Sequence, residues 1–137
     1  MFFSEGVSYK PKSKKSGKKI IAIVDDFETT TFTVEFALKN AGYDVVKAQS
    51  PEGILKFFDG RQIDLLISDY NMPQMAGHEL VKKIKAMPAY SHLPVLMLSS
   101  EKDPEKQRLS REAGAFGWIQ KPYELKRFIK IDRKSVV

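Results

Sequence analysis

Five polar residues of this chain stand at or just beyond the ends of four short apolar segments, and their types suggest one kind of chemistry. In chain order they are Asp25, Asp26, Asp69, Ser99 and Lys121. Three carboxylates close together repel one another unless a cation neutralises them. Because the chain has no cysteine and its two histidines are isolated, oxygen ligands for Mg²⁺ are favoured. A carboxylate beside such a cation, a hydroxyl and a lysine could accept a phosphoryl group.

Each of these residues also has a simpler role that the sequence leaves open. Asp26 could cap a helix that begins just after it. Ser99 could belong to an ordinary turn, and Lys121 could lie in the turn before a helix that starts near Pro122. No single residue therefore indicates a function. The prediction of a phosphoryl-accepting site depends on their combination at the ends of different strands.

The apolar segments have the length and composition of strands that are covered on both faces. The predicted strands cover 19–24, 43–48, 63–68, 94–98 and 116–119. Capping residues, first-turn prolines and apolar spacing predict helices over 27–41, 51–59, 77–87, 104–113 and 123–133. This alternation indicates one α/β domain with a parallel sheet. The ligand crevice of such a sheet lies outside the carboxyl ends of its strands.

The first predicted helix is expected to be amphipathic. Phe32, Phe36 and Ala37 are spaced by about one turn and are predicted to face the core. Val34 and Leu38 broaden this apolar face. A helix of this kind buries one side against the sheet.

The composition is that of an ordinary soluble domain. The chain has 137 residues, of which 42% are hydrophobic and 29% charged, enough for one domain with one core. No apolar run approaches the ~18 residues that a membrane-spanning helix needs, so no membrane insertion is expected. Without cysteine, disulfides are excluded, and the cytoplasm is the expected location.

The positive charge is concentrated near the N-terminus. Residues 1–19 hold six lysines and one acid, a net charge of +5, whereas the whole chain carries +6. We predict that residues 1–18 form a flexible basic arm and that residues 19–137 form the folded domain. A uniformly basic nucleic-acid-binding domain would look different, so nucleic acid is a disfavoured partner. An arm that contacts nucleic acid, anionic lipid or an acidic protein remains an alternative.

Four motifs give the sequence a family resemblance over about residues 19–134. They are VDD at 24–26, SDYNMPQMAG at 68–77, PVLMLSSE at 94–101 and KP at 121–122. In this order and spacing they resemble the receiver domain of two-component response regulators, and most of all the stand-alone chemotaxis regulators. The resemblance implies a doubly wound, flavodoxin-like fold with five parallel strands in the order 2-1-3-4-5 and five helices.

By this resemblance, Asp69 is the phosphoacceptor, and it receives its phosphoryl group from a sensor histidine kinase. The resemblance also implies a Mg²⁺ site formed by Asp26, Asp69 and the backbone carbonyl of Asn71. Asp25 would act on the ion through a water molecule. Lys121 would hold the phosphoryl group.

Four further positions are implied to respond to the phosphoryl group or to tune its lifetime. Ser99 would turn its hydroxyl toward the phosphoryl group, and it replaces the threonine that is commoner in the family. Asn71 and Glu101 occupy the two positions that tune hydrolysis, and this pair predicts rapid loss of phosphate. Trp118 stands where a Tyr or Phe usually switches between two rotamers, although a plain packing role is also open for so large a side chain.

The resemblance implies a signalling module that catalyses only its own phosphorylation and dephosphorylation, not an enzyme with other substrates. The chain ends at Val137, shortly after the last predicted helix, so we expect a single-domain regulator that signals by phosphorylation-dependent protein binding. In the family, the fourth helix, fifth strand and fifth helix form the partner surface. Here the last helix is basic, with Lys126, Arg127, Lys130, Arg133 and Lys134. A receiver fragment of a longer regulator is the alternative, and both a monomer and a phosphorylation-induced dimer are compatible with the sequence.

Overall fold

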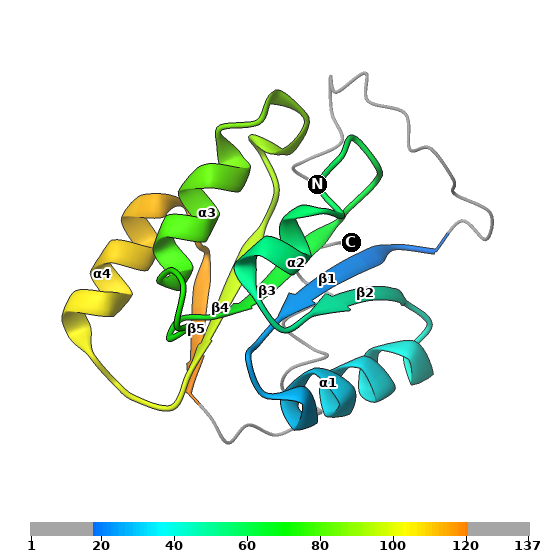
Figure 1. Cartoon of the computed structure of the whole chain (residues 1–137), viewed down its shortest axis with the longest axis horizontal. Coiled ribbons are helices and arrows are strands. Elements are labelled where there is room, and N and C mark those ends of the chain that lie inside the picture. Colours follow the sequence, from blue (N-terminus) through cyan, green and yellow to red (C-terminus); the bar gives the residue numbers. More distant parts are fainter. Residues whose placement is uncertain (1–17, 121–137) are drawn as a thin grey trace.

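The computed structural model describes residues 18–120, which form a five-stranded parallel sheet with helices on both faces (Figure 1). The strands are β1 (Ile20–Val24), β2 (Asp44–Ala48), β3 (Leu65–Asp69), β4 (Val95–Ser99) and β5 (Gly117–Gln120). Their order is β2-β1-β3-β4-β5, and every neighbouring pair is parallel. The predicted doubly wound fold and its strand order are therefore confirmed.

The helices of the described residues are α1 (Glu28–Asn40), α2 (Pro51–Leu55), α3 (Gly77–Lys85), α4 (Pro104–Ala113) and the 3-10 helix η1 (Pro88–Tyr90). The ends of α1, α3 and α4 agree with the predicted helices to within two residues. In contrast, α2 is shorter than predicted, because the chain after Leu55 continues in turns. There Phe57 and Phe58 donate backbone hydrogen bonds to the carbonyls of Ile54 and Leu55. The predicted fifth helix and the N-terminal arm lie outside the described residues.

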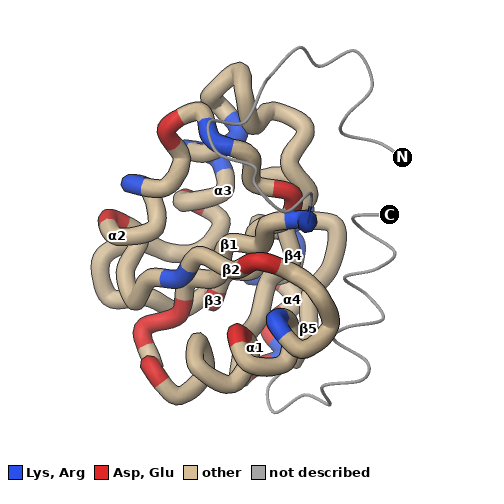
Figure 2. Tube along the Cα trace, turned by 90° about the vertical axis from the view of Figure 1, so that its right-hand side faces the viewer, with Lys and Arg blue, Asp and Glu red and all other residues tan. Residues whose placement is uncertain are grey.

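Charges of both signs are spread over the described residues (Figure 2). Residues 18–120 contain thirteen lysines and arginines and fourteen acids, so this part of the chain is nearly neutral. It therefore lacks the strong positive balance that is typical of nucleic-acid-binding domains. Within the same residues, no helix is both long and apolar enough to span a bilayer.

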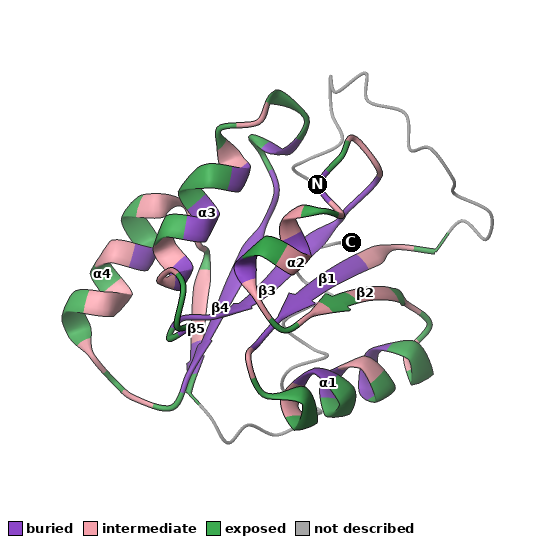
Figure 3. Cartoon of the chain, viewed as in Figure 1, coloured by how far each residue is buried: buried purple, intermediate pink, exposed green. Residues whose placement is uncertain are grey.

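The side chains of the sheet alternate between two apolar clusters, one on each face. Figure 3 shows the central strands β3 and β4 coloured as buried. On one face, Ile21 and Ile23 of β1 pack with residues of α1. On the other face, Ala22 and Val24 pack with residues of α2 and α3. All five residues of β3 are buried, as expected for a strand covered on both sides. The two cores thus hold β1 and β3 rigidly up to their carboxyl ends.

The buried face of α1 agrees with the predicted one at Val34, Ala37 and Leu38 but not at the two phenylalanines. Phe32 and Phe36, predicted to face the core, are 60% and 62% exposed, so the prediction is wrong for these two residues. The buried residues of α1 are Thr31, Val34, Ala37 and Leu38. They are three or four positions apart and form one stripe along the helix, whereas the two phenylalanines lie on the adjacent stripe. The ammonium group of Lys47 lies 5.9 Å from the centroid of the Phe32 ring.

The register between β1 and β3 is fixed, and it determines which residues leave the sheet together. At the N-terminal ends of the strands, Asp64 Oδ2 accepts hydrogen bonds from Ile20 N at 2.7 Å and Gln62 Nε2 at 2.6 Å. At the carboxyl ends, Val24 is paired with Ser68. The residues that follow Val24 and Ser68 therefore leave the sheet side by side.

Candidate functional site

Three carboxylates meet where β1 and β3 end. Asp25 and Asp26 follow β1, Asp69 is the last residue of β3, and the two strands are neighbours. One oxygen atom from each acid lies within 4.8 Å of the others. Asp25 and Asp69 are buried, whereas Asp26 is half-buried. The structure thus brings together the three acids that the sequence singled out.

Asp26 does not cap α1, which was its simpler alternative role. The N-cap residue is Phe27, and no side chain caps it. Instead, Asp25 Oδ1 accepts a hydrogen bond from the backbone N–H of Phe27 at 2.9 Å. The Oδ1 atom of Asp26 is buried and has no hydrogen-bond partner among the described residues. Because an unpartnered buried carboxylate oxygen is costly, its position beside two other acids points to a cation.

The donor atoms and the space around them fit Mg²⁺. Mg²⁺ prefers oxygen ligands, uses few carboxylates and keeps several waters. A cavity of about 350 Å³ adjoins the acids and is lined by Asp26, Tyr70, Asn71, Met72, Pro73 and Ala76. This space can hold waters and a phosphoryl group beside the carboxylates. Asn71, whose backbone carbonyl is a predicted ligand, borders the same cavity.

β4 places Ser99 beside the strand that carries Asp69. Asp69 is paired across the sheet with the residue that precedes Ser99, and Ser99 itself is buried. Ser99 Oγ accepts a hydrogen bond from the backbone N–H of Glu101 at 3.2 Å, which is a contact typical of turns. The predicted lysine, Lys121, directly follows Gln120, the partner of Ser99 on β5. Lys121 lies outside the described residues.

Asn71 and Glu101, the two predicted tuning residues, form one hydrogen-bonded network with Lys106 of α4. Lys106 Nζ donates to Asn71 Oδ1 at 3.0 Å and forms an ion pair with Glu101. Asn71 Nδ2 also donates to Glu101 Oε1 at 3.5 Å. The ion pair raises the pKa of the Lys106 ammonium and lowers the pKa of the Glu101 carboxyl. Both groups are therefore charged at neutral pH.

Tyr70, the residue after Asp69, links the acid cluster to α3 and β5. Its hydroxyl shares a hydrogen bond with His78 Nδ1 at 2.7 Å, and the two rings are stacked at 5.5 Å between centroids. Burial raises the pKa of the Tyr70 hydroxyl. The Tyr70 ring also lies 5.6 Å from Trp118. The predicted switch residue is thus in contact with the residue that follows Asp69, and its movement stays a prediction.

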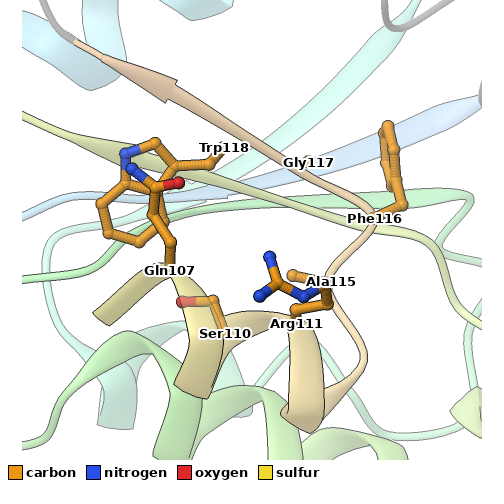
Figure 4. Close-up of a pocket in the computed structure, with 7 residues that line it drawn as sticks. All are labelled: Gln107, Ser110, Arg111, Ala115, Phe116, Gly117 and Trp118. Atoms are coloured by element: carbon orange, nitrogen blue, oxygen red, sulfur yellow. The ribbon is translucent and has the colours of Figure 1, made fainter. Parts of the chain in front are cut away.

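A groove of about 300 Å³ lies between α4 and β5 (Figure 4). It is lined by Gln107, Ser110, Arg111, Ala115, Phe116, Gly117 and Trp118. Figure 4 shows that α4 supplies its polar side chains, while β5 and the segment leading into it supply the two aromatic ones. Phe116 is 48% exposed. Two of the three elements of the predicted partner surface therefore border one groove.

Gly77 has a role at this site that the sequence did not indicate. It begins α3, and its backbone N–H donates to Tyr70 O at 2.7 Å. A Cβ atom at this position would lie 2.7 Å from Asp69 O and 2.9 Å from Tyr70 Cα. Both are backbone atoms, which cannot turn aside as a flexible side chain can. The absence of a side chain therefore allows α3 to begin directly against the end of β3.

We predict that Gly77→Ala lowers the free energy of unfolding by about 2 kcal/mol, although alanine is the better helix former. The reason is the forced displacement of the backbone around Asp69. Gly53→Ala in α2 is the matched control, because a Cβ there would meet side-chain atoms at 3.1 and 3.2 Å. Its stability should change by less than about 1 kcal/mol. Urea unfolding of both variants measures the difference, and a Gly77→Ala protein as stable as the control would contradict the prediction.

Comparisons with known proteins agree on one family. The model of the response regulator receiver domain matches residues 21–132. The two-component response regulator ORR8 of Oryza sativa subsp. indica is 34% identical over 106 residues, which cover 77% of this chain and 88% of that protein. The chemotaxis protein CheY-3 of Vibrio cholerae is 35% identical over 105 residues, covering 75% of this chain and 80% of that protein. The solved structure of Vibrio cholerae CheY4 matches with a TM-score of 0.82 and 33% identity, covering 86% of this chain and 98% of that one.

Proposed function

This chain belongs to the response regulator receiver domain family, and from this premise we propose that it accepts a phosphoryl group on Asp69 from a sensor histidine kinase. One observation carries the proposal. The carboxylates of Asp25, Asp26 and Asp69 lie within 4.8 Å of one another at the carboxyl edge of the sheet. Receiver domains are signalling proteins, so the chemistry proposed here is limited to the protein's own phosphorylation and dephosphorylation.

In the proposed reaction, a carboxylate oxygen of Asp69 attacks the phosphorus atom of the kinase phosphohistidine. A P–O bond forms while the P–N bond breaks, and the histidine imidazole leaves with the bonding electron pair and takes up a proton. Asp26, Asp69 and the carbonyl of Asn71 would hold Mg²⁺, with Asp25 acting through a water molecule. When bound, Mg²⁺ supplies charge neutralisation for the phosphoryl oxygens.

Two groups from neighbouring strands would contact the remaining phosphoryl oxygens. Ser99 Oγ accepts its hydrogen bond from Glu101 N, so the hydroxyl keeps its own hydrogen for donation to a phosphoryl oxygen. Lys121 would supply an ammonium group from the segment after β5. Both contacts stabilise charge on the transferred group, which is the main contribution that proteins make to phosphoryl transfer.

Incubation with acetyl phosphate and Mg²⁺, followed by intact-mass measurement and peptide mapping, tests this function. We expect one phosphoryl group per chain, located on Asp69, and no uptake when EDTA removes the metal ion. Acetyl phosphate replaces the kinase, so the test does not depend on knowing the cognate kinase. Modification at another residue, or equal uptake in EDTA, would contradict the proposal.

We predict that the phosphoryl group on Asp69 is lost within minutes. Asn71 lines the cavity beside Asp26, and its side chain is hydrogen-bonded to Glu101. Together the two polar side chains would orient a water molecule for attack on phosphorus. The measurement is the decline of phosphorylated mass after the donor has been removed by rapid desalting. A parallel sample with the donor retained controls for loss of protein. A half-life of hours would refute the prediction.

The output of the phosphorylated state is proposed to be binding of a target protein to α4, β5 and the predicted fifth helix. The groove between α4 and β5 supports this surface, because it combines exposed aromatic area at Phe116 with the guanidinium group of Arg111. Tyr70 and Trp118 connect this groove to the acceptor strand. A pulldown with the beryllofluoride-loaded protein would identify the target. The switching of Trp118, the oligomeric state and the cytoplasmic location stay predictions.

A further inference from the structure

Lys106 lies between two loops that border the acid cluster. Its ammonium group donates to Asn71 Oδ1 at 3.0 Å, forms an ion pair with Glu101, and lies 5.5 Å from the centroid of the Tyr70 ring. Asn71 comes two residues after Asp69, and Glu101 comes two residues after Ser99. The Lys106 side chain is only 30% exposed, and its helix packs against α3. One lysine therefore connects α4 to both loops at the entrance of the site.

The network contains one positive and one negative side chain, Lys106 and Glu101. Glu101 places a carboxylate in the loop after β4, the neighbour of the strand that carries Asp69, and Lys106 neutralises it. Lys106 forms the ion pair with Glu101 and also donates to Asn71 Oδ1 at 3.0 Å, so the two opposite charges are held together. The other charged residues between 101 and 106 are Lys102, Asp103 and Glu105, and Asp103 is the N-cap of α4. The loss of Lys106 alone would therefore make the entrance more negative.

We propose that Lys106 is a positioning residue that neutralises Glu101 and so allows dianionic phosphodonors to approach Asp69. This role rests on the proposed function, in which Asp69 is the acceptor. Phosphodonors such as acetyl phosphate are dianions near neutral pH, and an uncompensated carboxylate at the entrance repels them. Lys106 acts through Glu101 and Asn71, and it does not touch the reacting atoms.

A purely structural role for Lys106 predicts different behaviour. If Lys106 only held α4 in place, its removal would lower the phosphorylation rate equally with all donors. A second substitution at Glu101 would then not restore the rate. If Lys106 neutralises Glu101, its removal should slow a dianionic donor more than a less charged one. Removal of the carboxylate should then restore the rate. The two roles are therefore distinguished by donor charge and by a double-mutant cycle.

The experiment measures phosphorylation rates by timed intact mass, with acetyl phosphate as the dianionic donor and phosphoramidate as the less charged donor. We expect Lys106→Met to lower the rate of phosphorylation by acetyl phosphate about three-fold. The rate with phosphoramidate should fall much less. Lys106→Arg should keep most of the wild-type rate with acetyl phosphate. The double variant with Lys106→Met and Glu101→Gln should be phosphorylated at the same rate as Glu101→Gln alone. Lys102→Met removes an exposed lysine from the same segment and should match the wild type.

Two results would overturn the inference. One is a Lys106→Met rate with acetyl phosphate equal to that of the wild type. The other is an equal loss with both donors that persists in the Lys106→Met, Glu101→Gln double variant. Failure of the wild-type protein to take up a phosphoryl group on Asp69 would instead overturn the proposed function, so the two failures are distinguishable.

Discussion

Replacing Asp69 with asparagine is expected to abolish phosphoryl uptake from acetyl phosphate while leaving the fold intact. The side-chain amide has nearly the shape of the carboxyl group but lacks the anionic oxygen that attacks phosphorus. Shape matters here because Asp69 is 4% exposed at the end of a wholly buried strand. Intact-mass measurement should show uptake lowered about 10³-fold or more, to the background of the assay.

Glu28→Gln is the matched control for the loss of a carboxylate near the site. Glu28 is exposed in the first turn of α1, only two residues after Asp26, and it is not part of the acid cluster. This variant should take up a phosphoryl group like the wild type. Uptake by Asp69→Asn at the wild-type rate, with near-UV circular dichroism showing an unchanged fold, would place the acceptor elsewhere.

The strands and the candidate polar residues could be predicted because short stretches of sequence indicate them. Each strand is a short apolar run, and each candidate polar residue stands at or just beyond the end of such a run. Once the strands are parallel and adjacent, their carboxyl ends share one edge. The pairing of Val24 with Ser68 then brings Asp25 and Asp69 together. The adjacency of β1 and β3 was implied by the family resemblance, because local patterns do not determine the order of the strands.

The buried face of α1 could be predicted only in part, because Val34, Ala37 and Leu38 are buried as expected whereas Phe32 and Phe36 are not. Phe32 and Phe36 are one turn apart, which is the spacing of a buried stripe. The stripe that contains Val34 and Leu38 has the same period and is shifted by only two positions. Apolar spacing alone does not distinguish two such stripes, because the outcome depends on how α1 sits on the sheet. The smaller residues pack against β1 and β3, and the phenylalanines face outward.

Lys106 and Gly77 were missed because their roles depend on distant backbone segments. The hydrogen bond from Lys106 to Asn71 spans 35 residues, and no motif joins the two positions. For Gly77, the sequence predicts a helix start but not the approach of α3 to Asp69 O, where a Cβ would lie at 2.7 Å. Contacts of this kind arise only when α3 and α4 are placed on the sheet.

Replacing Asp26 with asparagine is expected to change stability in opposite directions with and without Mg²⁺. Without the metal ion, the variant should be more stable than the wild type by about 1 kcal/mol, because one of three mutually repelling carboxylates is removed. The amide can also donate hydrogen bonds to the neighbouring acids. With the metal ion, the variant lacks an anionic ligand, and its affinity for Mg²⁺ should be about 100-fold lower.

Urea unfolding of Asp26→Asn and the wild type, in EDTA and at several Mg²⁺ concentrations, measures both effects. A ligand that binds only the folded state stabilises it in proportion to the logarithm of its concentration above Kd, so the wild-type protein should gain stability where the variant does not. The order of the two stabilities should therefore invert as Mg²⁺ is added. Glu28→Gln, which keeps all three acids, should follow the wild type. A variant that is less stable than the wild type in EDTA, yet gains equally from Mg²⁺, would show that Asp26 supports the fold and does not bind the metal ion.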